Sequence, residues 1–306
     1  MSNDNKSAAA KTVLYVMGTS YSGSSLLNAL LDNQPGIRGL GEAHYFGKPD
    51  AQVYCAVCKV LVLECEFKKT LLPSALDLYD KVFAADPETQ VLVNASKHPS
   101  LLWRPPIPPG VRAAAVVLAK SPHAFAHSYG VHHPESGSVP AWLTEWFEVH
   151  VLLLRCLARA AHSILALDRE EPAIPPELTC VLQYRRLATD TAGVVQQICK
   201  MLGQPFDPQA MQLWGHAKGT HTVGGNYAVW CQRVKDIQFF ETREYLDGKY
   251  REQWGQVFHD EVWRADEPFK QAAAEFYQQP MSADYTECLA RLGFGTVDDL
   301  LADLKQ

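Results

Sequence analysis

Residues 12–31 read TVLYVMGTSYSGSSLLNALL, so a strand pattern, a glycine- and serine-rich turn and a helix pattern follow one another directly. The apolar run 12–17 is typical of a buried strand, and residues 26–31 continue as an apolar helix. A turn between two such elements gathers backbone N–H groups and the positive end of a helix dipole around one point. The stretch therefore predicts a loop that cradles an anionic group.

The turn itself, residues 18–25, has the form of a nucleotide-phosphate loop without its lysine. In NTP-hydrolysing proteins the second glycine of G-x-x-x-x-G is followed by Lys, which reaches the β- and γ-phosphates. Here Ser24 follows Gly23 instead. The loop therefore favours a terminal group that carries less charge than a γ-phosphate.

Four more strand patterns follow, at residues 37–40, 90–94, 112–118 and 178–184. Helical patterns separate them, most clearly at residues 140–164 and 190–202, and Gly203 ends the second of these. Alternating strands and helices predict an α/β fold. We expect a P-loop NTPase-like, three-layer fold with a central parallel sheet flanked by helices.

The two ends of the chain differ from this alternating pattern. Residues 1–10 are polar and alanine-rich, so we expect a disordered tail, with residues 11–306 forming a single domain. From about residue 216 the chain is rich in Trp, Tyr and Phe and shows no strand pattern. We expect this C-terminal part to consist of helices and loops that cover the site.

Bulk composition narrows the functional classes. The 306 residues are 47% hydrophobic, which suffices for a buried core, and the net charge of −6 argues against nucleic-acid binding. The polar N-terminus lacks the apolar core of a signal peptide. The apolar tract 149–167 contains Arg155 and Arg159, so it fails as a membrane span. We expect a soluble, cytoplasmic protein without a membrane partner.

Three of the eight cysteines, Cys55, Cys58 and Cys65, lie close together in the sequence. Structural zinc normally takes four ligands, and His44 is the nearest candidate for the fourth. Because no clear fourth ligand completes the pattern, packed or redox-sensitive thiols are favoured over zinc, and no metal is expected. The other five cysteines stand singly in apolar surroundings, as small core residues do.

Polar clusters follow four of the predicted strands. They are residues 18–25, 42–44, 96–98 and 120–123. In an open parallel sheet, ligands bind beyond the carboxyl ends of the strands. We therefore expect one edge of the sheet to bring the four clusters together.

The order of these segments resembles the sulfotransferases that use 3′-phosphoadenosine 5′-phosphosulfate (PAPS), especially the bacterial branch akin to carbohydrate sulfotransferases. The resemblance covers most of the chain. It rests on the Cys-rich segment and on YSGSSLL (21–27), GLGE (39–42), ASKHP (95–99), KSPHAFAHSY (120–129), YRRL (184–187), LGQPF (202–206) and HTVGGN (221–226).

The resemblance implies that the loop binds the 5′-phosphosulfate and that Lys120 and Ser128 bind the 3′-phosphate, without a metal. The product would be adenosine 3′,5′-bisphosphate (PAP). The residues expected to bind the donor are Ser20, Tyr21, Ser22, Gly23, Ser24, Ser25, Lys120, Ser128, Tyr184, His221, Gly225 and Asn226. The expected acceptor is a sugar or a secondary metabolite such as an alkaloid, and the expected assembly is a monomer or a homodimer.

Three residues are candidates for the chemistry. Glu42 is expected to be the general base that takes the proton from an acceptor hydroxyl or amine, a role that the resemblance also implies. Lys97 follows a buried strand and is expected to stabilise the charge that grows as the S–O bond breaks. His44 is the rival base, because in a strand it would share the face of Glu42.

Three positions depart from the family's pattern. Tyr21 stands where the family often has Arg or Lys, and Lys120 stands where it often has Arg. Lys120 keeps the charge but binds phosphate as a point charge, not as a two-pronged donor. Residues 228–230 lack an arginine that often follows the Gly-Asn pair, and Arg233 or Lys218 is a candidate substitute.

A local cluster of histidines accompanies the Lys120 segment. Its members are His123, His127, His132 and His133. Histidines without carboxylate partners are weak evidence for a metal site. We assign most of them to the rim of the substrate site or to the surface.

Two other functions share parts of this pattern. A P-loop small-molecule kinase has a similar architecture, although no lysine follows Gly23 and no acidic residue is clearly placed for Mg²⁺. A non-catalytic nucleotide-binding protein with a decayed sulfotransferase site would account for the three departures. Comparing the binding of PAP with the binding of ATP and Mg²⁺ distinguishes a sulfotransferase from a kinase. Turnover with the sulfuryl donor distinguishes a sulfotransferase from a non-catalytic binding protein.

Overall fold

The computed structural model of the chain describes residues 11–47, 53, 55, 61–62, 64–66, 78–97, 99, 101, 107–158, 174–211 and 261–306. Up to residue 136 the elements, with η for a 3₁₀ helix, are β1 (Thr12–Met17), α1 (Ser24–Asp32), β2 (Ile37–Gly41), η1 (Ala43–Gly47), α3 (Leu78–Ala85), β3 (Val91–Asn94), β4 (Arg112–Ala119), α5 (Pro122–His132) and η2 (Pro134–Ser136). They are followed by α6 (Val139–Ala158), η3 (Pro176–Leu178), β5 (Thr179–Gln183), α7 (Tyr184–Thr189), α8 (Thr191–Leu202), η4 (Pro208–Met211), η7 (Val262–Ala265), α11 (Glu267–Tyr277), α12 (Ala283–Leu292) and α13 (Val297–Asp303).

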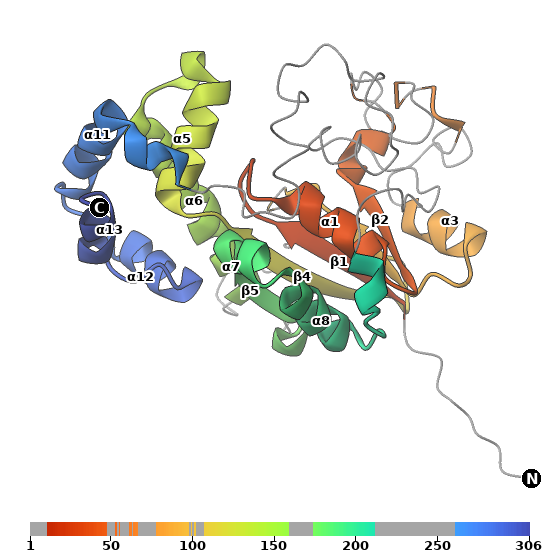
Figure 1. Cartoon of the computed structure of the whole chain (residues 1–306). Helices are drawn as coiled ribbons and strands as arrows, with labels where there is room; N and C mark the ends of the chain where they lie inside the picture. The colour runs from red at the N-terminus through yellow and green to blue at the C-terminus, as the bar shows by residue number, and fades with distance from the viewer. Residues whose placement is uncertain are drawn as a thin grey trace, which may run out of the picture.

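The strands form one parallel sheet in the order β2-β3-β1-β4-β5, with β1 at its centre (Figure 1). Thr12 of β1 pairs in register with Val91 of β3 on one side and with Arg112 of β4 on the other. Because all five strands run in the same direction, their carboxyl ends lie along one edge of the sheet. The expected central parallel sheet flanked by helices is confirmed.

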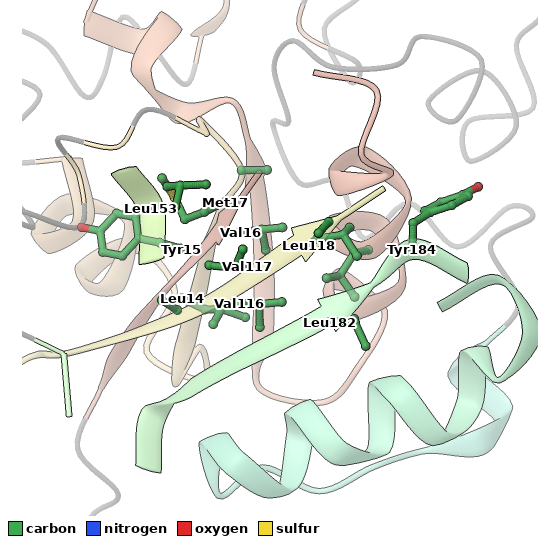
Figure 2. Packing of buried hydrophobic residues seen from close by; sticks show 14 of the residues in the cluster. Leu14, Tyr15, Val16, Met17, Val116, Val117, Leu118, Leu153, Leu182 and Tyr184 are labelled. Atoms are coloured by element: carbon green, nitrogen blue, oxygen red, sulfur yellow. The ribbon is translucent and has the colours of Figure 1, made fainter. Parts of the chain in front are cut away.

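The central strands are buried along nearly their whole length. All six residues of β1 are buried, and β4 is buried after its first residue. Successive side chains of a strand point to opposite faces, and Tyr15 and Met17 lie on the side where Leu153 of α6 packs (Figure 2). Burial on both faces explains why these strands are continuous apolar runs without polar alternation.

Local signals set the ends of the later elements. The Asp190 carboxylate accepts a hydrogen bond from the Gly193 N–H at 3.1 Å and caps α8, and Gly203, with φ 68°, ends it. The end at Gly203 follows the predicted pattern. Strand β5 is shorter than the predicted range 178–184, because Leu178 ends a 3₁₀ helix and Tyr184 already begins α7.

The described C-terminal residues, 261–306, are helical, as expected, and pack on α6. The Phe147 ring of α6 stacks on the Tyr285 ring of α12, with 4.6 Å between the ring centroids. Figure 1 shows α11, α12 and α13 beside α5 and α6 at one end of the sheet. Within the described ranges, no helix combines the length and the apolar character that a bilayer crossing requires.

Candidate active site

The loop between β1 and α1 is tightly packed against its neighbours. Gly18 and Gly23 have φ values of 148° and 88°, which L side chains rarely adopt. A side chain at Gly18 would collide with the Leu118 carbonyl oxygen, and one at Gly23 would collide with the Tyr184 ring. The glycines therefore let the loop lie directly against β4 and α7.

The loop also presents hydrogen-bonding groups that the described residues do not use. The hydroxyl groups of Thr19 and Ser22 are buried and have no hydrogen-bond partner in the described part of the chain. Helix α1 begins at Ser24 without a side-chain cap, and its first turn holds no acidic residue. Uncapped N–H groups at a helix start, together with orphaned hydroxyls, suit an anionic ligand.

The other residues of the loop differ in exposure. Ser20 and Tyr21 are exposed, Ser24 is buried, and Ser25 is half-buried. Tyr21 adopts φ 60°, a left-handed conformation that costs a non-glycine residue about 1–2 kcal/mol. Its side chain extends away from the loop toward the C-terminal end of α5, where it contacts His132 and His133.

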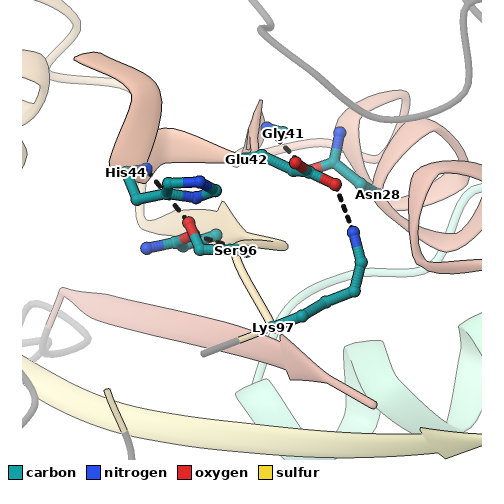
Figure 3. Close-up of polar contacts among 7 residues, drawn as sticks. Asn28, Gly41, Glu42, His44, Ser96 and Lys97 are labelled. Atoms are coloured by element: carbon teal, nitrogen blue, oxygen red, sulfur yellow. Dashed lines mark hydrogen bonds and ion pairs between the residues drawn. The ribbon is translucent and has the colours of Figure 1, made fainter. Parts of the chain in front are cut away.

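Glu42 and Lys97 form an ion pair between the ends of β2 and β3 (Figure 3). Glu42 follows Gly41, whose φ of 68° turns the chain and whose N–H donates to Asn28 Oδ1 at 3.2 Å. Lys97 has φ 63°. In the described ranges, Lys97 and Tyr21 are the two non-glycine residues whose φ is positive. Strained backbone that persists at one place points to a functional site.

A buried hydrogen-bond network lies beside this pair. The Asn94 side-chain oxygen accepts hydrogen bonds from the Ser96 N–H and the Ser96 hydroxyl, and its NH₂ group donates to the Tyr79 hydroxyl at 2.7 Å. Ser96 Oγ in turn accepts the His44 N–H at 3.1 Å (Figure 3). The network fixes the segment from which the Lys97 side chain extends.

The expected strand geometry at His44 is wrong. Residues Ala43–Gly47 form a 3₁₀ helix, so the alternation that would place His44 on the face of Glu42 does not apply. Gly41, with its positive φ, ends β2 before that alternation can continue. Glu42 pairs with Lys97, whereas His44 is held by its backbone N–H.

Lys120 and Ser128 come together as expected. Lys120 Nζ lies 3.1 Å from Ser128 Oγ, and it also lies 5.7 Å from the centroid of the Tyr184 ring. The same Tyr184 ring covers Gly23 of the loop, and Trp146 Nε1 donates to the Lys120 carbonyl at 2.9 Å. Tyr184 therefore connects the predicted sites for the two ends of the donor.

Two members of the histidine cluster, His123 and His127, contact acidic residues of the C-terminal part of the chain. His123 is fully buried and contacts the rings of Trp263 and Tyr277, so it lies neither at a rim nor on the surface, where most of the cluster was expected. It lies 3.7 Å from an Asp303 carboxylate oxygen, and burial is the main cause that lowers its pKa. His127 lies 3.4 Å from an Asp266 oxygen. These two histidines join α5 to the C-terminal helices.

Two predicted features lie partly or wholly outside the described residues. The first is the donor-binding group His221, Gly225 and Asn226, with the candidate substitutes Lys218 and Arg233. The second is the cysteine cluster: Cys55 and Cys65 are buried, and Cys58 lies outside the described residues. Within the described ranges, no group of three or more His, Cys, Asp or Glu residues is arranged to hold a metal ion.

Comparison with solved structures finds sulfotransferase domains. The sulfotransferase domain from the curacin biosynthetic pathway has a TM-score of 0.53 and 15% identity, over 94% of this chain and 99% of that domain. The sulfotransferase domain from the Synechococcus PCC 7002 olefin synthase has a TM-score of 0.51 and 14% identity, over 94% of this chain and 96% of that domain. No protein-family model and no curated protein sequence matches the chain. At these identities the likeness shows the fold, so the chain has the sulfotransferase fold that the sequence resemblance implies.

Proposed function

We propose that this protein is a sulfotransferase that moves a sulfuryl group from PAPS to a hydroxyl or amine of a small polar acceptor. The observation that carries the proposal is the ion pair of Glu42 and Lys97 at the same sheet edge as a phosphate loop without lysine. A base at this edge can take the proton of the acceptor, and a cation can stabilise the charge that the leaving oxygen acquires. The shared fold supports the same class of reaction.

The residues at the sheet edge fit the donor at both of its charged ends. The orphaned hydroxyls of Thr19 and Ser22 and the uncapped start of α1 suit the 5′-phosphosulfate. Lys120 and Ser128, already 3.1 Å apart, suit the 3′-phosphate. When bound, the donor supplies an activated sulfuryl group and PAP as the leaving group.

Glu42 acts as the base in this proposal. Its carboxylate takes the proton of the acceptor hydroxyl or amine while that oxygen or nitrogen forms a bond to sulfur and the sulfur–oxygen bond to PAP breaks. Lys97 Nζ stabilises the negative charge that the leaving oxygen acquires. Before ligands bind, the two side chains neutralise each other, and both are only about 15% exposed. An anionic donor gives Lys97 a second partner and makes Glu42 available to the acceptor.

The acceptor class is inferred from one of the structural neighbours. One structural neighbour belongs to the curacin biosynthetic pathway, which supports a secondary metabolite as acceptor. We infer that the protein acts in the cytoplasm, as a monomer or a homodimer. The chemistry of Glu42 suits a hydroxyl and an amine equally, because either must lose a proton on transfer.

Ligand-induced thermal stabilisation tests the donor assignment. A ligand that binds only the folded state raises the melting temperature in proportion to the logarithm of its concentration over Kd. PAP without metal is expected to raise the melting temperature of this protein. A rise with ATP and Mg²⁺ but none with PAP would favour the kinase alternative and overturn the proposal.

A further inference from the structure

His132 lies on the same face of α5 as Ser128. The two residues are four positions apart in this helix, so their side chains are neighbours, with Cβ atoms about 5–6 Å apart. Lys120, at the end of β4, already contacts Ser128. Lys120, Ser128 and His132 therefore form one polar row, which runs from the sheet edge along the helix.

Tyr21 of the phosphate loop stacks on this row. Its ring lies parallel to the His132 imidazole, with an interplanar angle of 9° and 4.9 Å between centroids. The Tyr21 hydroxyl lies 3.0 Å from Nε2 of the neighbouring His133. A stacked ring covers one face of His132 and leaves the ring edge, which carries both nitrogens, available for hydrogen bonds. Tyr21 thus fixes His132 between the loop and the Lys120–Ser128 pair.

The charged groups around His132 are mostly positive. Burial is the largest cause that lowers its pKa, and the charges of His133 and Lys120 lower it further. On the side of the phosphate loop, the polar group beside these histidines is the neutral hydroxyl of Tyr21. Among the acidic residues, Glu135 lies 3.8 Å from Nδ1 of His133, and Glu145 also interacts with His133. The positive charges would stabilise an anion placed among these groups.

We infer that His132 is the third ligand of the 3′-phosphate of PAP, beside Lys120 and Ser128, and that it binds as the protonated imidazole; this rests on the proposed function. A phosphate monoester carries about −1.5 to −2 charge at neutral pH. Lys120 supplies one positive charge and Ser128 none. A protonated His132 supplies the second, at a site where the chain has lysine in place of the family's arginine.

The inference makes donor binding proton-linked. His132 is expected to take up a proton from solution when PAP binds, because the nearby phosphate raises the proton affinity of its imidazole. The affinity for PAP should therefore rise as the pH falls from 8 to 6.5. Isothermal titration calorimetry of the full-length protein, in two buffers with different ionisation enthalpies, measures the protons taken up per PAP.

The test compares His132→Gln with His133→Gln. Glutamine keeps a hydrogen-bonding side chain but cannot titrate. We expect His132→Gln to weaken PAP binding about 10-fold at pH 6.5, with little loss at pH 8, and to abolish the proton uptake. We expect His133→Gln to keep the uptake, since glutamine can still bond the Tyr21 hydroxyl. Adenosine 5′-phosphate, which lacks the 3′-phosphate, should bind the wild-type protein and His132→Gln with equal affinity.

The outcomes separate this inference from the proposed function. If PAP binds the wild-type protein but His132→Gln keeps the full proton uptake, the inference is wrong and the donor assignment stands. The inference also fails if His133→Gln is the variant that loses the uptake, or if His132→Gln weakens both nucleotides equally. If PAP does not bind the wild-type protein at all, the proposed function itself fails.

Discussion

Lys97 and Glu42 form an ion pair although 55 residues separate them in the sequence. The parallel sheet places the ends of β2 and β3 side by side, and the left-handed backbone of Lys97 belongs to the turn that follows β3. The residues next to each of them in the sequence do not account for this contact. Their meeting at the sheet edge, beside the loop of β1, is the basis of the functional proposal.

Replacing the base is expected to separate chemistry from binding. Glu42→Gln keeps the size of the side chain and can still accept a hydrogen bond from Lys97, but it cannot take a proton. We expect sulfuryl transfer to fall about 10²–10⁴-fold, with PAP affinity near the wild-type value. Initial rates and calorimetric titration measure the two quantities.

Glu88→Gln is the matched control for this change, because Glu88 is exposed in the turn before β3, away from the ion pair. It should keep full activity. A fully active Glu42→Gln enzyme would contradict the assignment of Glu42 as base.

The backbone at Lys97 predicts a difference between two variants that remove the same charge. At φ 63°, alanine keeps the strain of the left-handed conformation and glycine relieves it. The strain costs about 1–2 kcal/mol, and the greater freedom of glycine in the unfolded chain offsets part of that. Lys97→Gly should be more stable than Lys97→Ala by about 1 kcal/mol, as measured by urea unfolding. A more stable alanine variant would show that residue 97 does not hold this conformation.

Much of the fold could be predicted from local pattern. Strands β1 and β4 are buried on both faces, so their apolar runs are unbroken and their limits were predicted to within a residue. The cap at Asp190 and the end at Gly203 depend only on neighbouring residues. The convergence of polar clusters followed from the rule that the carboxyl ends of parallel strands share an edge.

The parts that the sequence did not predict depend on contacts between distant segments. His123 is buried because η7 and the C-terminal helices cover α5, which no local pattern around residue 123 shows. The stack of Tyr21 on His132 joins the loop of β1 to the end of α5. The four-residue spacing of Ser128 and His132 was visible in the sequence, but it indicated a site only once Tyr21 was placed beside it.

The packing of the loop predicts a large cost for a single methyl group. Gly23→Ala adds a side chain at φ 88° that collides with the Tyr184 ring. Gly203→Ala is the matched control, because φ is 68° there and no atom lies within 4 Å of the added carbon. We expect Gly203→Ala to lower the free energy of unfolding by about 1 kcal/mol. Gly23→Ala should lower it by about 2 kcal/mol more, because the added methyl group overpacks the loop.

The same Gly23→Ala change should also weaken PAP binding, because the loop must move away from Tyr184, whereas Gly203→Ala should leave binding unchanged. Thermal unfolding with and without PAP measures both effects. Equal losses in the two variants would contradict the close contact between Gly23 and Tyr184.

Buried His150 predicts a loss of stability in acid. Burial is the main cause that lowers its pKa to about 4, while its Nδ1–H donates to the Trp146 carbonyl. In the unfolded chain the His150 ring takes up its second proton near pH 6.5, whereas in the folded protein it stays neutral down to about pH 4. The contribution of neutral His150 to the free energy of unfolding is therefore complete above pH 6.5 and is lost as the pH falls toward 4. His150→Gln, which does not titrate, should show a shallower loss between pH 6.5 and 4.5 in urea unfolding. Identical pH profiles would exclude His150 as a source of the acid sensitivity.

The most direct test of the central claim is a transfer assay with purified protein. PAPS labelled with ³⁵S and, separately, ATP labelled at the γ-phosphate with Mg²⁺ are each incubated with a panel of small hydroxyl and amine acceptors. We predict that ³⁵S is transferred to an acceptor with release of an equal amount of PAP, that Glu42→Gln lowers the rate of this transfer about 10²–10⁴-fold, and that no label is transferred from ATP. Transfer of the γ-phosphate, or tight binding of PAP without turnover on any acceptor, would contradict the account.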